Sequence, residues 1–540
     1  MKIPDLNIKR LVVCLTFLAV FAMSARISVD TDTWWHLRAG QLIVEHRAVL
    51  QQDVFSYTMA GEIWQYPGWL VEVPMYAIYQ TFGPGGLNIW TAAMVTLTFC
   101  FVWMTLSGGE FTRAFVTILA AAASGVFWAA RPNLMTFLLA GVFLWILDAN
   151  AERKRWNAHS HNSEIGQETG QSRVEKKTDS NKGGLDQEIS SSKGAIVGGK
   201  PTADRGRPSS VVGRLWLLPV LMIIWANSHG GFAVGFILWG AYFVDALARW
   251  RMGTCKRANM QTLLIIGLFM VLAVCINPSG PAILLYAFKT LNIGVLQDFI
   301  QEWQSPNFHH MQVQPFLWLL LLTIAAIGTS RKRISLVDYL LLSGFAYLGF
   351  VAGRNIALFA LAAPMILTRH ALPFLEEAGS RLGFRGSTQT PVRASRWQSI
   401  LNWIILGVLI LAVALKSSLV IPIAVNQEHF EESLPVAAVA FLKDKRPEGQ
   451  LFNSYNWGGY LLWALPEYPV FVDGRTDLYG DELIRQWMQV VQADDGWQEA
   501  LEQWDVGVIL LEPDRPVVDK LSGEGWELLF EDDIAVVYGR

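Results

Sequence analysis

The sequence lacks the short motifs that mark several common enzyme classes. It contains no glycine-rich P-loop sequence, which excludes a P-loop ATPase, and neither a His-Glu-Xaa-Xaa-His nor a paired Cys-Xaa-Xaa-Cys zinc motif. The Gly-Xaa-Ser-Xaa-Gly elbow of the α/β-hydrolases is also missing. Only 4 of the 540 residues are cysteine, and none lies in the polar C-terminal part, so we expect no disulfide framework.

Charged residues are scarce as well. They make up 16% of the chain, against 52% hydrophobic residues, and the mean hydropathy is +0.31. Because a helix needs about 20 apolar residues to cross a bilayer, the repeated apolar runs predict a polytopic α-helical membrane protein with about 11 spans. The predicted spans lie near residues 10–29, 86–106, 113–130, 134–149, 214–228, 231–248, 260–276, 314–329, 334–352, 355–369 and 400–421.

The basic residues of the predicted loops indicate one orientation in the membrane. Lysine and arginine favour cytoplasmic loops, and with the N-terminus inside, every basic loop falls inside. The first apolar run, Leu11–Phe21, has features of a secretory signal. We interpret it as a retained anchor, because cleavage would detach the acidic residues that follow it. Residues 150–213 lack apolar periodicity and predict a disordered cytoplasmic loop.

The same orientation places the remaining loops outside the membrane. These are residues 30–85, 131–133, 227–231, 277–310, 353–355 and the chain after about 422. Arg131 and Arg354 occupy two of the shortest outer turns and oppose the charge trend. A residue that opposes the trend in a short turn is a candidate for function.

The chain turns acidic after the last predicted span. Residues 422–540 carry 23 acidic and 8 basic residues, a net charge of −15. Alternating apolar and polar positions predict a soluble α/β domain over 422–540, outside the membrane, after a transmembrane module over 1–421. Its predicted strands cover 450–453, 469–472, 506–511 and a hairpin at 526–538, and its predicted helices cover 458–465 and 482–491.

An acidic stretch follows the first apolar run. Asp30 and Asp32 lie where the first helix would leave the bilayer, and charge there is costly unless it faces water, a partner or a substrate. Two acids at this spacing suit a general base or a metal-assisted carboxylate, although a solvated helix terminus would show the same pattern. His36 is four residues beyond Asp32 and shares its helix face, so it could orient that carboxylate or bind phosphate, and Arg38 lies on the same helix.

Other outer segments hold further candidates. The planar guanidinium groups of Arg131 and Arg354 suit phosphate oxygens, although lipid-anchoring arginines would look alike. His229 lies before paired glycines, which let a ligand approach the backbone, and Glu302 could be a second acid or a cation ligand. The turn-rich stretches 456–460 and 473–477 could form a site, but we interpret them as ordinary turns.

These residues resemble the GT-C class of membrane glycosyltransferases, which includes protein O-mannosyltransferases, the aminoarabinose transferase of lipid A and oligosaccharyltransferase catalytic subunits. That class has an acidic residue just after the first span, in a long outer loop. The stretches 30–40, 53–58 and 69–72, with 453–460 and 472–475, are similar to a bacterial branch of the class. The mannosyltransferases have Asp-Glu where Asp32 is followed by Thr33, which leaves open whether Asp30 or Asp32 is the base. From its register with the following helix we predict Asp32.

The resemblance implies an inverting transferase in a bacterial inner or cell membrane. It would move a sugar from a polyprenyl-phosphate donor to an unknown acceptor on the outer face, among membrane lipids and without nucleic acid. Asp32 and Asp30 would be catalytic. The donor phosphate would be bound by Arg131, Arg354, His229, His36 and Arg38. Asp30, Asp32 and Glu302 could also hold a Mg²⁺ or Mn²⁺ ion that assists the reaction. The alternative is a lipid or polysaccharide transporter or flippase, but transporters place charges near the midplane.

Overall fold

The computed structural model describes residues 5–152, 211–286, 293–294, 300–381 and 395–540. The chain divides into two compact units, residues 1–145 with 218–540, and residues 146–217. Most of the loop predicted over 150–213 lies outside the described residues, and in the second unit the structure describes the end of the helix Asn133–Glu152 and α6 (Val211–Leu215). The site lies in the first unit.

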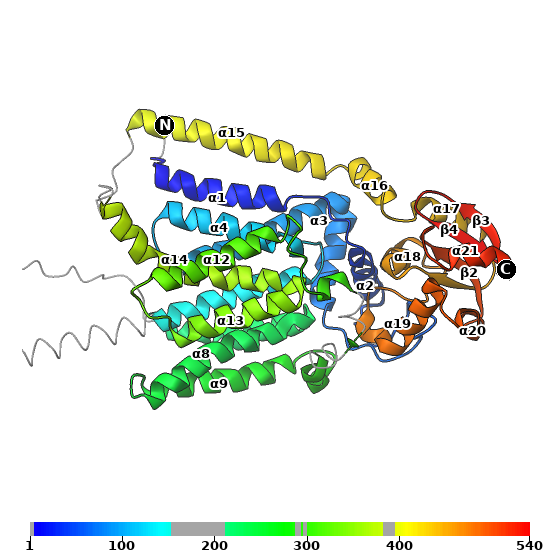
Figure 1. The fold of residues 1–540 in the computed structure, drawn as a ribbon, viewed down its shortest axis with the longest axis horizontal. Helices are drawn as coiled ribbons and strands as arrows, with labels where there is room; N and C mark the ends of the chain where they lie inside the picture. The colour runs from blue at the N-terminus through cyan, green and yellow to red at the C-terminus, as the bar shows by residue number, and fades with distance from the viewer. Residues whose placement is uncertain (1–4, 153–210, 287–292, 295–299, 382–394) are drawn as a thin grey trace, which may run out of the picture. The chain divides into compact units, whose positions relative to one another are not determined.

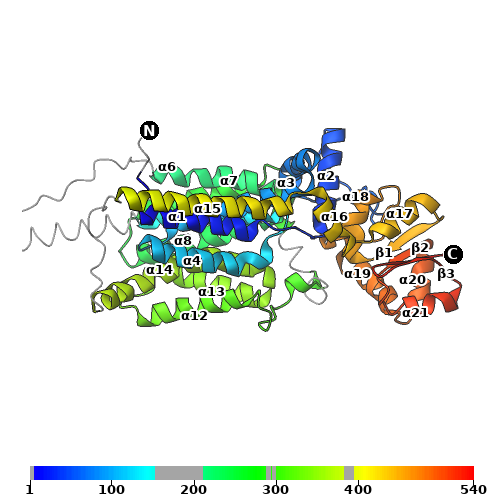
Figure 2. The same ribbon diagram turned by 90° about the horizontal axis from the view of Figure 1, so that it is seen from above.

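Apolar helices dominate the first unit, and many of them run side by side in both views (Figures 1 and 2). In the described part of the chain, seven helices are long and apolar enough to cross a membrane: Trp69–Thr105, Glu110–Phe127, Asn133–Glu152, Gly230–Arg251, Arg257–Val274, Gly353–Ala378 and Arg396–Val420. The polytopic helical class is therefore confirmed. The predicted count of about 11 is not, because several apolar windows form shorter helices, at Gly213–Ala226, Gln314–Thr329 and Leu336–Val351.

The individual helices of this part follow the apolar windows. They are α1 (Ile8–Ser24), α3 (Trp69–Thr105), α4 (Glu110–Ser124), α7 (Leu217–Ala226), α8 (Ala233–Arg251), α9 (Arg257–Val274), α12 (Gln314–Thr329), α13 (Leu336–Val351), α14 (Ile356–Arg381) and α15 (Arg396–Val420). Helix α3 is kinked at Gly83, which has a φ of 63° and precedes Pro84. A positive φ is accessible to glycine at little cost, so α3 consists of two arms that meet at Gly83.

The loop after α1 contains α2 (Asp32–His46), which packs on both α3 and the C-terminal part of the chain. Its buried face includes Trp34, Trp35 and Leu37. The indole of Trp34 meets the rings of Tyr460 and Phe430 edge to face, at centroid distances of 5.5 and 5.0 Å. Such aromatic pairs are favourable beyond the area that they bury, so α2 is held in a defined orientation.

Residues 423–540 form helices and a sheet. The helices are α16 (Ile423–Glu431), α17 (Val436–Lys445), α18 (Gly458–Ala464), α19 (Thr476–Gln492), α20 (Trp497–Gln503) and α21 (Val518–Leu521), and the strands are β1 (Gln450–Asn453), β2 (Val506–Leu511), β3 (Glu527–Glu531) and β4 (Val536–Gly539). The strand order is β1-β2-β4-β3, with β1 and β2 parallel and the other pairs antiparallel. The strand predicted at 469–472 does not join the sheet, because Val470 pairs with Ser56 of the loop instead.

A buried ion-pair network joins that loop to the C-terminal α/β region. Arg475 donates to Asp53 from Nη1 at 2.5 Å and to Asp473 from Nη2 at 2.7 Å, and all three side chains are fully buried. The guanidinium also lies over the rings of Phe55 and Trp64, at 4.9 and 4.7 Å from their centroids. Because a buried charge is costly without partners, Arg475 fixes the loop and the α/β region together.

Replacing Arg475 with Ala should destabilise the protein by ~3–5 kcal/mol, because two buried carboxylates would lose their partner. The measurement is unfolding of the purified protein in detergent, followed by the fluorescence of its tryptophans. Arg515→Ala is the control, since Arg515 pairs with Glu512 at a partly exposed position, where a pair contributes about 1 kcal/mol or less. Equal stability losses in the two variants would contradict this role for Arg475.

Candidate active site

The first turn of α2 positions the two predicted acids. Asp30 precedes the helix and accepts a hydrogen bond at Oδ1 from the backbone N–H of Asp32, at 3.0 Å. Thr33 Oγ1 donates to the carbonyl oxygen of Ala130 at 3.1 Å. This contact packs the start of α2 on the turn that contains Arg131. Residues about 100 positions apart in sequence are thus adjacent in the fold.

Arg131 binds both acids and a third one. Its Nη1 lies 2.6 Å from Asp32 Oδ2, its Nε 3.2 Å from Asp30 Oδ2, and its Nη2 3.0 Å from Glu302 Oε2. The side chains of Asp30, Asp32 and Arg131 are only 22%, 24% and 18% exposed. Three acidic candidates from two segments of the chain therefore converge on one guanidinium.

Glu302 links this cluster to Arg354. Its Oε1 lies 3.5 Å from Arg354 Nη1, and the Arg354 guanidinium lies over the ring of Trp303, 4.4 Å from the centroid. The two turns also join through the backbone, where Gly353 N donates to the carbonyl oxygen of Gln304 at 3.0 Å. Among the described residues, Arg354 thus has one carboxylate contact, and a longer one, whereas Arg131 has three. Arg354 therefore has more N–H groups left to bind an added anion.

The cluster shifts the pKa values of its acids in opposite directions. Burial raises the pKa of Asp32 to about 7, with Asp30 and Glu302 adding to the rise and Arg131 opposing it. Burial raises the pKa of Asp30 in the same way. Burial alone would raise the pKa of Glu302, but Arg131 and Arg354 lower it to about 2. At neutral pH Glu302 is a fixed anion, and Asp32 is close to the point where it exchanges a proton.

Gly474 of the α/β region lies against the second oxygen of Asp32. A methyl group on Gly474 would overlap Asp32 Oδ1. Among the described residues Oδ1 accepts no hydrogen bond, whereas both oxygens of Asp30 are engaged. Tyr455 is close enough for the charge of Asp32 to act on it, and burial raises its pKa. The stretches 456–460 and 473–477, interpreted above as ordinary turns, therefore border the acid cluster.

His229 lies beside the two arginines as a neutral ring. Its Nδ1 accepts the backbone N–H of Gly231 at 3.0 Å and lies 2.8 Å from Thr136 Oγ1, which in turn accepts from Trp225 Nε1. A neutral ring that accepts at Nδ1 carries its hydrogen on Nε2. Burial, with the charges of Arg354 and Arg131, lowers the pKa of His229 to about 3. This histidine therefore offers a neutral N–H donor.

The two remaining predicted residues of α2 have other partners. His36 contacts Glu72 and Tyr66 rather than Asp32, so the expectation that it orients that carboxylate is not met. Arg38 donates to Gln41 of its own helix at 2.8 Å and makes no ion pair among the described residues. Helical periodicity explains the result for Arg38, which points away from the face that Asp32 and His36 share.

The proposed cation ligands do not form a cation site. Asp30, Asp32 and Glu302 all face Arg131, whose guanidinium lies between them at the position that an ion would need. In the described part of the chain, no group of three or more His, Cys, Asp and Glu side chains could hold a metal. The three carboxylates are therefore better suited to bind the guanidinium of Arg131 than a divalent metal ion.

Sequence reasoning did not select Glu72, Tyr66 or Tyr455 as site residues, and it interpreted the turn that contains Gly474 as an ordinary one. Glu72 carried a signal, since an acid near the start of a long apolar helix is costly and needs a reason. The turn that contains Gly474 was a candidate by composition, but its contact with Asp32 joins segments more than 400 residues apart and has no local signal. The site is thus built from the loop that contains α2, from four short segments that contain Arg131, His229, Glu302 and Arg354, and from the α/β region.

Glu302→Gln should lower the pKa of Asp32, because the variant removes a negative charge that raises it and leaves Arg131 with fewer carboxylates to bind. Carbodiimide modifies protonated carboxyl groups, so the extent of Asp32 labelling, mapped by mass spectrometry across pH, should show its midpoint at lower pH. Glu512→Gln, which alters a remote carboxylate paired with Arg515, is the control. A midpoint that stays in place would contradict the coupling between Glu302 and Asp32.

Solved structures share this architecture at low sequence identity. Archaeal oligosaccharyltransferase AglB from Archaeoglobus fulgidus, in complex with an inhibitory peptide and a dolichol-phosphate, matches with a TM-score of 0.55 and 10% identity, over 93% of this chain and 69% of that one. The Archaeoglobus fulgidus oligosaccharyltransferase tethered to an acceptor peptide gives 0.51 and 10%, over 92% and 69%. ArnT from Cupriavidus metallidurans in the apo state gives 0.41 and 13%, over 98% and 96%.

No protein-family model matches the chain, and no curated protein matches it in sequence. The likeness therefore concerns the fold alone. The chain has the fold of the GT-C membrane glycosyltransferases, as the resemblance of its motifs predicted.

Proposed function

We propose that this protein is a glycosyltransferase that moves a sugar from a polyprenyl-phosphate donor to an acceptor on the outer face of the membrane. The observation that carries the proposal is the acid pair at the start of α2, which shares Arg131 and has one carboxylate oxygen free of hydrogen bonds among the described residues. This arrangement occurs directly after the first apolar helix of a chain with the GT-C fold. The loop-by-loop distribution of basic residues supports an outward-facing site.

Asp32 acts as the general base in this mechanism. Its Oδ1 takes the proton from the acceptor hydroxyl or amine, and the acceptor attacks the anomeric carbon with inversion. The bond from that carbon to the phosphate oxygen breaks, and its electron pair stays with the lipid phosphate. A base whose pKa lies near the working pH is efficient, and burial brings Asp32 to about 7. The rate should therefore rise as pH increases through about 7, as Asp32 loses its proton.

Cations and neutral donors stabilise the leaving phosphate. Arg354 offers N–H groups beyond its single contact with Glu302, and His229 offers Nε2–H. Preorganised donors of this kind stabilise developing charge without reorganising. Arg131 holds the acids and balances their charge, a role different from the direct phosphate contact predicted for it. Arg38 takes no part in the proposal, since it bonds along its own helix, and no step passes through a metal ion.

The proposal assigns a donor and an acceptor site to one outer region. The AglB neighbour is in complex with a dolichol-phosphate and an inhibitory peptide, and a second neighbour carries an acceptor peptide. By analogy, the donor lipid would approach from the membrane side. The acceptor would approach from the side of Gly474 and Tyr455, where the α/β region borders Asp32.

Asp32→Asn should reduce turnover on the order of 10²-fold or more, since Asn keeps the shape of Asp but removes its basicity. Asp30→Asn should reduce it less, because Asp30 only supports the helix start and Arg131. The assay is release of polyprenyl phosphate from a panel of polyprenyl-phosphate sugars by the purified protein, with water as the acceptor of the sugar, since this product is common to every donor sugar. Asp245→Asn, a buried acid of α8 paired with Arg249, controls for destabilisation. Near-normal turnover in the Asp30, Asp32 double variant would overturn the mechanism and favour a transporter.

Gly474→Ala should also lower turnover, by about tenfold or more, because the added methyl group forces Asp32 Oδ1 out of position and small displacements of reacting groups are costly. The same release assay measures it, with the melting temperature recorded in parallel. Gly523→Ala is the matched control, since a methyl group at Gly523 meets nothing within 4 Å. Unchanged turnover in Gly474→Ala would show that the α/β region does not constrain the base.

A further inference from the structure

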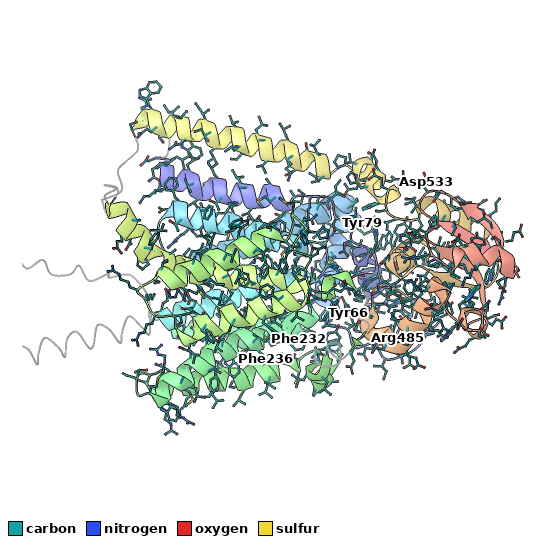
Figure 3. The ribbon with its side chains drawn as sticks, in the orientation of Figure 1. Tyr66, Tyr79, Phe232, Phe236, Arg485 and Asp533 are labelled. Carbon is teal, nitrogen blue, oxygen red and sulfur yellow. The ribbon has the colours of Figure 1, made fainter. Side chains whose placement is uncertain are left out.

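A second buried cluster lies on α2, one helical turn after Asp32. His36 Nδ1 is 2.7 Å from Glu72 Oε1, and Tyr66 Oη is 2.6 Å from the same oxygen and 2.9 Å from His36 Nδ1. The whole residue is 6% exposed for His36 and 0% for Glu72. Figure 3 labels Tyr66, which lies beside α2. The proposed mechanism so far gives this group no role.

The fold brings these side chains together by close helix packing. A methyl group on Gly40 of α2 would overlap the carbonyl oxygen of Glu72, so glycine is needed for α2 to lie directly on α3. Glu72 Oε2 is buried and has no hydrogen-bond partner among the described residues. A buried carboxyl group without a full set of partners is costly, which indicates selection for something other than stability.

Proton counting fixes the state of His36 Nε2. The enclosed cluster avoids net charge. A neutral arrangement with the Glu72 hydrogen on Oε2 would bury a donor without a partner among the described residues, which leaves two others. In one, protonated Glu72 donates to Nδ1 and the ring carries its hydrogen on Nε2. In the other, Glu72 is an anion and the ring is a cation with hydrogens on both nitrogens. Nε2 is therefore a donor in both arrangements, and moving one proton between Glu72 and Nδ1 changes the charge of the ring.

His36 belongs to the same region as the phosphate-binding candidates. It is four residues from Asp32 on one helix face, and Asp32 is bonded to Arg131. Burial lowers the pKa of His36 well below its usual value, and the charge of Arg131 lowers it further. The resting ring is therefore neutral. A phosphate would raise the proton affinity of the ring, because an added anion favours a nearby cation.

We propose that Glu72 and Tyr66 are positioning residues that present His36 Nε2–H to the phosphate of the donor lipid, and that Glu72 gives its proton to Nδ1 as the phosphate leaves. This inference rests on the proposed function. When the bond between the anomeric carbon and the phosphate oxygen breaks, the electron pair goes to the phosphate, and the proton moves from Glu72 to Nδ1. The ring becomes a cation beside the new anion, and Glu72 becomes the carboxylate that balances it. No proton enters from solvent.

The test separates binding from turnover in the full-length protein. His36→Leu removes the donor, and it should weaken binding of a polyprenyl monophosphate about tenfold, since hydrogen bonds to charged groups are stronger than those between neutral groups. Binding of the uncharged polyprenol should not change. Glu72→Gln can still donate to Nδ1 but cannot transfer a proton. It should bind the monophosphate normally and release it from donor sugars at least about tenfold more slowly.

The controls distinguish this relay from a structural role and from failure of the proposed function. Asp338→Asn, which removes another buried acid from an apolar helix where it pairs with Arg369 at 2.9 Å, should change neither measurement. Normal turnover in Glu72→Gln, or equal loss of polyprenol and monophosphate binding in His36→Leu, would overturn the relay. A wild-type protein that neither binds the monophosphate nor releases it from any donor would instead overturn the proposed function.

Discussion

The arrangement of the candidate site depends on one buried guanidinium, that of Arg475. It bonds Asp53 of the loop after α1 and Asp473 of the α/β region, with no exposure of any of the three side chains. Such a network stabilises little relative to an apolar core, but it tolerates only one geometry, since each charge needs its partner. The next residue toward the N-terminus is Gly474, which lies against Asp32. Fixing Arg475 therefore fixes the wall beside the proposed base.

A second guanidinium organises the chemistry itself. Arg131 attracts three carboxylates from two other segments of the chain. Burial, with the charges of Asp30 and Glu302, raises the pKa of Asp32, whereas Arg131 and Arg354 keep Glu302 ionised. The arginine keeps the pair of acids in an enclosed position that neither could occupy alone. It also prevents the acids from acting as a cation site in this arrangement. One residue thus sets both the position and the basicity of the proposed base.

The two histidines near the arginines both carry a hydrogen on Nε2, but the groups that bind their Nδ1 atoms differ. His229 has its Nδ1 occupied by the Gly231 N–H and bordered by Thr136, so its hydrogen is on Nε2 and its surroundings cannot change its charge. His36 has Glu72 and Tyr66 at Nδ1, and this pair can supply a proton. The difference is chemical, because an amide N–H only donates, whereas a carboxyl group exchanges protons. Under the proposed mechanism one ring is a fixed donor and the other follows the charge of the phosphate.

The sequence by itself determined the membrane class, the GT-C resemblance and the small set of outer residues from which the site is built. Apolar runs and loop charges are local properties, so Asp30, Asp32, Arg131, Glu302 and Arg354 could be selected without knowing the fold. Only the tertiary structure decided how they combine. Arg131 binds the acids rather than standing free, Arg38 faces elsewhere, and Glu72 pairs with His36. The lengths of the apolar helices were also decided there, because turns and packing determine where an apolar run stops being helical. Contacts such as Gly474 with Asp32 depend on close packing between distant segments, and no local pattern encodes that packing.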